Sequence, residues 1–215
     1  TLYYNPSAFV LKMEPDGTIL NWYSDSSFYY EGFSIVADSN LNYYACFARI
    51  SLYSIGYTNC LSSVNKFNGN LDKVWTKEFD DINNYVHCKD IVNDNNHLYV
   101  VGEYRETLIL DNETLEADSS EGHPFNNGFV IKYDLNGNEQ WGKKYGGKID
   151  EVFNCILTDN DNNFYILGNS QSDTLCFDQN LLINDNDTFY YYIHTIGTFI
   201  TRYSNAVIAK FSTSP

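Results

Sequence analysis

The segment GFVIKYDLNGNEQWGKKYGGKIDEVFNCILTDNDNNFYILG, residues 128–168, decides the fold. It holds four short apolar runs, VIKYD, EQWGKKY, NCILTD and FYILG, and turn-forming Asn, Asp and Gly residues separate them. No run of ten or more residues keeps the 3.6-residue period of a capped helix. The segment therefore predicts four antiparallel strands rather than a βαβ arrangement.

Parts of this segment recur along the chain. GFVIKYDLNG resembles AFVLKMEPDG (8–17), SVNKFNGN (63–70) and AVIAKF (206–211). The alignment makes four lysines equivalent: Lys12, Lys66, Lys132 and Lys210. A Trp follows the first three lysines by ten, nine and nine residues, at Trp22, Trp75 and Trp141, which we expect to occupy equivalent places.

A second alignment places one Tyr of each copy in a later strand, at Tyr43, Tyr99 and Tyr165. The distance from Lys to the end of that strand, at Cys46, Gly102 and Gly168, is nearly constant at 34, 36 and 36 residues. The next Lys follows after 20, 30 and 42 residues, so the variation in length falls in one connection per repeat.

Four strands per repeat of 50 to 80 residues are typical of a β-propeller blade. We interpret residues 1–215 as one partial all-β propeller of four-stranded antiparallel blades, about three blades plus an extra strand, within a larger propeller. Its repeat units are 8–61, 62–127 and 128–205, and a fourth starts at 206–215. A solenoid is the structural alternative, but its repeats usually carry one or two strands.

The segment 128–168 resembles the bacterial secreted β-propeller repeat family, the seven-bladed or SBBP-type repeat, and 63–102 and 8–46 resemble it more distantly. The resemblance implies inner strands near 33–37, 86–92 and 153–158, and no catalytic residues define the family. It also implies that the chain opens with an outer strand pair and ends on a strand starting at Ala206. The family occurs in large exported or surface-displayed proteins, which implies an extracellular or cell-surface location.

The charge of the chain excludes some partners. Thirteen Lys and Arg against 28 Asp and Glu give a net charge of -15, which repels phosphate backbones and anionic lipids. No apolar stretch is long enough for a membrane helix. The chain starts at Thr, which we interpret as a mature or excised piece of a longer precursor.

The clearest metal motif is DNDNN, where Asp159, Asp161 and Asn163 alternate like the oxygen ligands that open a calcium loop. Phe164 stands where such a loop needs Gly, and no Glu follows at the twelfth position. We therefore favour a plain turn and keep calcium as a possible cofactor; no other cofactor is indicated.

Five cysteines are too few for a disulfide scaffold and show no metal-binding spacing. Cys46 and Cys60 flank one connection between neighbouring strands, so a disulfide between them is conceivable. Cys88 and Cys155 align on neighbouring inner strands and are expected to be free and buried.

Enzyme signatures are absent from the sequence. It contains no GxSxG, HExxH or P-loop motif, and its four His residues stand singly. We therefore expect a non-catalytic propeller module that binds a protein or glycan partner. The alternatives are a carbohydrate-binding or glycan-processing propeller, and a structural spacer or assembly subunit that pairs with other blades or chains.

The variable connections 47–61, 103–127 and 169–205 emerge on one face of a propeller, where function usually concentrates. The loops that lead from one blade to the next emerge on the same face. The expected partner-binding side chains are non-repeating aromatics of this face: Tyr29 and Tyr30 in such a loop, and Tyr190, Tyr191 and Tyr192 in the longest variable connection. The alternative for 103–127 is that TLIL and TLEA form an outer hairpin that covers a sheet edge.

Overall fold

The computed structural model of the chain is all-β. It describes residues 8–25, 30–52, 58–79, 85–120, 123–159, 163–172, 174–178, 180–184, 189–190 and 206–212. These residues form antiparallel sheets of two to four strands and no helix, so none of them belongs to a helix that could cross a membrane. The predicted all-β class is confirmed.

Two sheets have four strands each and follow chain order from one edge to the other. The first sheet contains β3 (Tyr30–Ala37), β4 (Tyr43–Leu52), β5 (Thr58–Phe67) and β6 (Lys73–Glu78). The second sheet contains β7 (Tyr85–Asn93), β8 (His97–Arg105), β13 (Asn126–Asp134) and β14 (Glu139–Tyr145). Within the described residues, each sheet repeats the strand order expected for one repeat.

Incomplete sheets stand at both ends. The N-terminal pair joins β1 (Ala8–Met13) to β2 (Ile19–Asp25). The third sheet contains β15 (Glu151–Thr158), β16 (Asn163–Ser170) and β20 (Ala206–Ser212). Both agree with the expected outer pair at the start and the last strand from Ala206.

Short strands fill the connections. In 103–127, β9 (Thr107–Ile109) pairs with β10 (Thr114–Glu116), and β11 (Ser119–Ser120) with β12 (His123–Pro124). The predicted hairpin of TLIL and TLEA is thus confirmed. After β16, a small sheet joins β17 (Thr174–Phe177), β18 (Asn180–Asn184) and β19 (Phe189–Tyr190).

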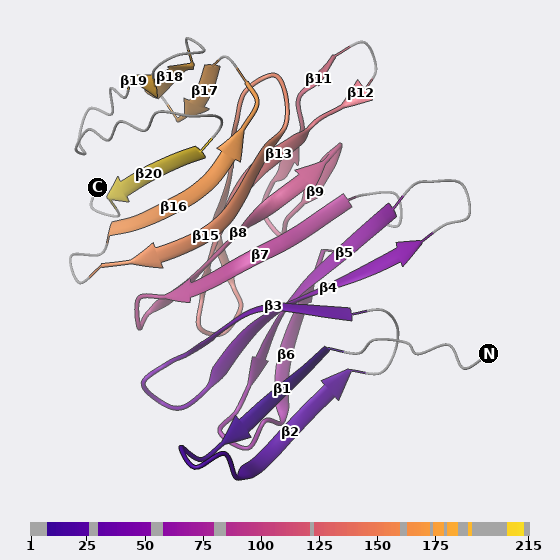
Figure 1. Ribbon diagram of the computed structural model, residues 1–215, viewed down its shortest axis with the longest axis vertical. Coiled ribbons are helices and arrows are strands. Elements are labelled where there is room, and N and C mark those ends of the chain that lie inside the picture. The colour runs from indigo at the N-terminus through magenta and orange to yellow at the C-terminus, as the bar shows by residue number, and fades with distance from the viewer. Residues whose placement is uncertain are drawn as a thin grey trace.

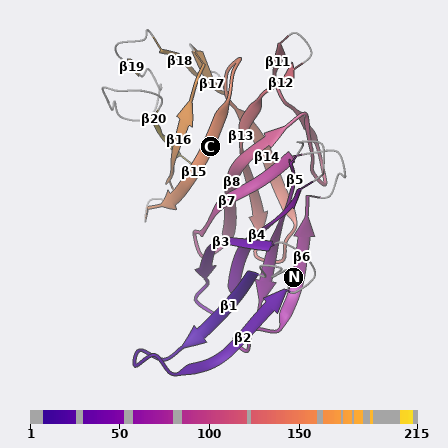
Figure 2. The same cartoon turned by 45° about the vertical axis from the view of Figure 1, so that its right-hand side comes forward.

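The sheets stack face to face in chain order, from the N-terminal pair at the bottom of Figure 1 to the third sheet at its upper left, and Figure 2 shows the same succession. One apolar cluster fills each gap between neighbouring sheets. Aromatic rings contribute to all three clusters; Tyr99 of the second sheet and Phe164 of the third, for example, stack with centroids 5.3 Å apart. Many of the Tyr and Phe side chains therefore pack one sheet against the next.

The strand register defines which residues are equivalent. Lys66 lies opposite Trp75 and Lys132 opposite Trp141, but Lys12 lies opposite Asn21. The connection between the two strands has the same length in all three cases, so Trp22 stands one position further along its strand. Because neighbouring residues of a strand point to opposite faces, Trp22 faces away from the stack and is 62% exposed. The expected equivalence of the three Trp residues is wrong for Trp22.

Candidate functional site

The two ends of the stacked sheets differ. At one end, which we call the turn end, short turns connect the first two strands of each sheet and the outer strand pairs. At the opposite end, which we call the loop end, the longer connections leave the sheets.

The turn end repeats one arrangement in the first, second and third sheets. Asp38, Asp94 and Asp159 each accept hydrogen bonds from backbone N–H groups of their own turn and one from a tyrosine hydroxyl, given by Tyr44, Tyr99 and Tyr165 at 3.0, 3.0 and 2.8 Å. Lys66, Lys132 and Lys210 lie over the rings of these tyrosines at 5.2–5.3 Å. This arrangement is a structural element of the repeat rather than a binding site.

The tyrosine register corrects one sequence alignment. Lys66 pairs with Tyr44, just as Lys132 pairs with Tyr99 and Lys210 with Tyr165. Tyr44, not Tyr43, is therefore the repeated tyrosine. The sequence NYYAC offers two adjacent tyrosines, and only the hydrogen bond to Asp38 distinguishes them.

The calcium motif lies in one of these turns. Both oxygens of Asp159 accept hydrogen bonds from the side-chain amide of Asn163 at 3.1 and 2.8 Å, and the backbone N–H of Asn163 donates at 2.9 Å. Asp161 lies outside the described residues. These hydrogen bonds account for an Asp at 159 and an Asn at 163 in this turn. No cluster of three or more possible metal ligands exists in the described part of the chain.

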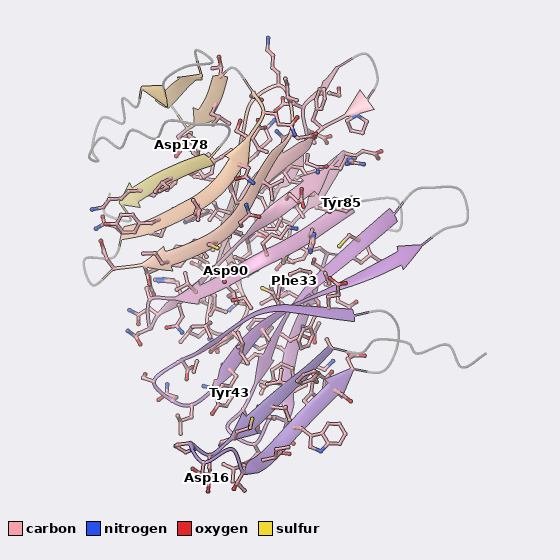
Figure 3. The ribbon with its side chains drawn as sticks, viewed as in Figure 1. Asp16, Phe33, Tyr43, Tyr85, Asp90 and Asp178 are labelled. Atoms are coloured by element: carbon pink, nitrogen blue, oxygen red, sulfur yellow. The ribbon has the colours of Figure 1, made fainter. Side chains whose placement is uncertain are left out.

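The loop end of the second sheet carries a dense polar cluster around Glu103. Its carboxylate lies 3.1 Å from Nζ of Lys89 and accepts hydrogen bonds from Asn126 Nδ2 at 2.8 Å and the Tyr85 hydroxyl at 3.3 Å. Nδ1 of His87 lies 3.6 Å from the same carboxylate. Figure 3 shows Tyr85 at this end of β7, near Phe33, whose ring packs edge-on against His87.

The charges of this cluster are paired. Burial alone would raise the pKa of Glu103, but the hydrogen bond with His87 and the charge of Lys89 outweigh it and hold that pKa below its ordinary value. The nearby Cys60 is no activated nucleophile, because burial raises its pKa to about 12. Nε2 of His87 is buried without a hydrogen-bond partner.

A pocket of about 470 Å³ opens at the loop end beside the third sheet. Its lining combines two lysines, one carboxylate and hydroxyl groups with a single large apolar side chain. The lining residues are Asp118, Lys144, Gly146, Gly147, Lys148, Ile149, Ser172, Thr174 and Cys176. None of them is aromatic, so the pocket is suited to a small polar group rather than to a flat ring.

Buried Glu151 shapes this pocket from below. It accepts hydrogen bonds from the backbone N–H of Gly147 at 2.9 Å and from the hydroxyls of Ser170 and Ser172. A Cβ at Gly146 would lie 2.6 Å from the Glu151 carboxylate, and one at Gly147 would lie 2.1 Å from the carbonyl oxygen of Thr174. Both positions therefore require glycine, which explains the Gly pair of the sequence.

The pKa of Glu151 is shifted in the opposite direction to that of Glu103. Burial raises the pKa of Glu151, the hydrogen bonds from Ser172, Gly147 and Ser170 only partly offset it, and the pKa stays above its ordinary value. At the rim, Lys144 Nζ lies 3.1 Å from the Asp118 carboxylate, whereas Lys148 is exposed. The pocket thus presents a local cation in a chain of net charge -15.

None of the tyrosines expected to bind a partner is among the residues that line this pocket. Tyr29, Tyr191 and Tyr192 lie outside the described residues. Tyr30 begins β3 and Tyr190 ends β19, and of these two residues the structure describes the backbone only. Tyr30 therefore lies at the loop end of the first sheet, whereas β19 belongs to the small sheet that follows β16.

The cysteines differ from the expectation. Cys46 and Cys60 are free and buried, and the register places Cys46 opposite Val64 and Cys60 opposite Ile50, so they are not cross-strand neighbours. A disulfide between them is therefore not formed. Cys88 is free and buried as expected, but Cys155 is exposed, because the register aligns Cys88 with Phe153 and Cys155 with Asp90.

Sequence reasoning missed the Glu103 cluster and the pocket around Gly146 and Gly147. The first joins residues of three strands whose sequence spacing is unremarkable, and the bond from Asn126 to Glu103 appears only when the strands pair. For the pocket, the adjacent glycines followed by Asp150 and Glu151 were a usable signal, because two glycines in a row indicate a close approach of backbone.

Comparison with known proteins gives no further assignment: no family model matches this chain, and no curated protein matches it.

Proposed function

We propose that the chain is a non-catalytic β-propeller module of an exported or cell-surface protein, which uses its loop end to bind a protein or glycan partner. The observation that carries this proposal is the contrast between the two ends. The turn end repeats the same Asp–Tyr–Lys arrangement in three sheets, whereas the loop end carries connections of different length and the pocket lined by Lys144 and Lys148.

The propeller assignment is supported by successive antiparallel sheets that repeat one strand order and stack face to face. Closing a ring around a central channel requires more sheets than the described residues supply. The proposed binding needs no cofactor. The exported or surface location is supported only by the sequence resemblance.

Two alternatives remain distinguishable. A carbohydrate-binding or glycan-processing propeller is favoured by Tyr30 and Tyr85, which begin β3 and β7 at the loop end, but the pocket lining contains no aromatic side chain on which a sugar ring would stack. A structural spacer or assembly subunit is favoured by apolar side chains exposed on the outward faces of the N-terminal pair and of the third sheet.

The test is binding of the purified chain to a glycan array and to a panel of purified cell-surface proteins, with hydrolysis of every bound glycan assayed in parallel. Two loop-end variants, Lys148→Gln and the triple replacement of Tyr190, Tyr191 and Tyr192 by Ser, are compared with Asn136→Asp. The last variant lowers the net charge by one, as Lys148→Gln does, but lies in a turn at the opposite end.

We expect at least one loop-end variant to weaken binding roughly tenfold or more, as truncation of a contact at an interface centre does, and the control to bind like the wild type. Thermal stability should hardly change in any of the variants. Binding that neither loop-end variant affects would refute the proposed site, and turnover of a bound glycan would favour the glycan-processing alternative.

A further inference from the structure

The stack of sheets has two outward faces, one at each terminus of the chain. Inside the chain, each sheet covers its neighbour with the same positions of the repeat. The face of the second sheet that meets the first contributes Phe129, Ile131 and Tyr133, which are at most 2% exposed. Its opposite face contributes Tyr99, Val101 and Val130, which the third sheet buries completely.

The N-terminal pair presents the first kind of face without a cover. Aligning Lys12 with Lys132 makes Phe9, Leu11 and Met13 equivalent to Phe129, Ile131 and Tyr133. Phe9, Leu11 and Met13 are 63%, 42% and 51% exposed. Together with Leu20 and Trp22, which point the same way from β2, they form what we call the N-terminal face.

A groove extends this apolar surface inward. It has a volume of about 480 Å³ and runs beside the edge of β1 that no described strand pairs with. Its lining comes from β1, β3 and β4 and includes Phe9, Leu11, Phe33, Ile35 and Phe47. The uncovered surface is therefore larger than the two strands alone.

The third sheet presents the second kind of face, also without a cover. Aligning Lys210 with Lys132 makes Leu167 equivalent to Val101 and Ile208 equivalent to Val130. Leu167 and Ile208 are 43% and 38% exposed, and Leu157 beside them is 55% exposed. These three residues define the C-terminal face.

We propose that a second copy of this chain covers the N-terminal face with its C-terminal face, so that copies stack head to tail. This goes beyond the proposed function, which concerns the loop end. The occupant is inferred from the chain itself. The first sheet buries Phe129, Ile131 and Tyr133 of the second sheet with one of its faces, and the third sheet carries the equivalent face. Most exposed large apolar side chains of the described residues lie on these two faces, as expected of surfaces that become buried.

A repeated polar contact fixes the register of this stacking. Nζ of Lys12 donates to the carbonyl oxygen of Gly69 in the first sheet, and Nζ of Lys66 to that of Leu135 in the second, both at 2.9 Å. In each case the acceptor stands three residues after the equivalent lysine of the next sheet. The same rule directs Lys210 of one copy to the carbonyl oxygen of Pro15 of the next.

Such a contact is heterologous, because two different surfaces meet. It predicts a specific pattern for variants that place a charge on one face only. Trp22→Asp places a charge on the N-terminal face, and Leu167→Asp places one on the C-terminal face, so each variant loses one of the two contact surfaces. Ile109→Asp is the matched control, because Ile109 is 56% exposed on the β9–β10 hairpin, away from both faces.

The test is sedimentation equilibrium of the 215-residue chain over a wide range of concentration. The wild type and Ile109→Asp should associate, and each face variant alone should remain monomeric. Mixing Trp22→Asp with Leu167→Asp should restore one intact contact and give a heterodimer that grows no further. Circular dichroism verifies folding, and Leu11→Ser and Leu157→Ser replace any variant that fails to fold.

Three results would overturn the proposal: a wild type that stays monomeric throughout, a mixture of the two face variants that forms no heterodimer, or a Leu167→Asp variant that associates like the wild type. The last result would mean that N-terminal faces pair with each other. Lys148→Gln should leave association unchanged, so failure of this inference is distinguishable from failure of the proposed function.

Discussion

β13–β14 and β1–β2 are the same strand pair of the repeat in two different surroundings. Both pairs are antiparallel, both contain a bulge after the repeated lysine, and both connect through a turn of equal length. Yet Phe129 and Ile131 are fully buried, whereas Phe9 and Leu11 are exposed.

The difference separates hairpin formation, which depends on local sequence, from burial, which depends on tertiary packing. Local sequence suffices to form the hairpin and its turn, since Gly17 and Gly137 adopt the same left-handed backbone at φ 90° and 85°. Burial depends on a neighbouring sheet. An apolar residue at a repeat position therefore contributes to stability only where the stack continues.

The largest expected effect comes from truncating one phenylalanine in each surrounding. Phe129→Ala should lower the free energy of unfolding by about 3–5 kcal/mol, because it leaves a cavity between the first and second sheets. Phe9→Ala should change it by less than about 0.5 kcal/mol in the monomer. Urea unfolding of both variants, at concentrations where the chain is monomeric, measures the two values.

Equal losses for the two variants would contradict this comparison, because Phe9 would then be as well covered as Phe129. Leu108→Ala is a useful reference for the method. Leu108 is 1% exposed in the same cluster but belongs to the connecting hairpin rather than to a repeated strand.

The repeat made most of the fold predictable. The lysine alignment predicted the repeated strands, because constant spacing reflects sheets that must match in length. The strand order implied by the family resemblance added the incomplete pair at the start and the last strand at Ala206. The alignment failed by one residue at Tyr43 and Trp22, since adjacent residues of a strand look equivalent in sequence but point to opposite faces. The candidate site was less predictable, because Lys144 and Ser172 meet only through strands that are distant in sequence.

The second prediction compares a turn inside the stack with the turn of the open pair. Asp94→Ala should lower stability by about 2 kcal/mol, because the N–H groups of Asn96 and His97 and the Tyr99 hydroxyl lose their acceptor. Asp16→Ala should have a smaller effect, since Asp16 accepts hydrogen bonds from Thr18 and from its own backbone at a fully exposed turn. Thermal unfolding of both variants tests the difference, and a larger loss for Asp16→Ala would contradict it.

The pH dependence of the same turn gives a third prediction. Burial would raise the pKa of Asp94, but the hydrogen bonds from Asn96, His97 and Tyr99 outweigh it, so the folded-state pKa lies below the ordinary value. The ionised carboxylate therefore stabilises the fold above its unfolded pKa of about 4, and this contribution is lost as pH falls through the folded-state pKa. The stability difference between wild type and Asp94→Ala should be constant near neutral pH and shrink in acid. A difference that grew in acid would show that the carboxyl is favoured in its protonated form.

The smallest expected effect on stability concerns the tryptophans. Trp75 and Trp141 pack between sheets, against Tyr44 and Phe164 respectively, whereas Trp22 is 62% exposed. Trp22→Phe should therefore change the free energy of unfolding by less than about 0.5 kcal/mol. It should nevertheless remove most of the fluorescence that acrylamide can quench, because only an accessible indole meets the quencher, and Trp141→Phe should leave that fraction nearly intact.

The head-to-tail contact adds a condition: quenching of the wild type should weaken as protein concentration rises, since a second copy then covers Trp22. Strong quenching that is unchanged across the range in which the chain associates would place the contact elsewhere, and weak quenching already in the monomer would mean that Trp22 is covered by its own chain.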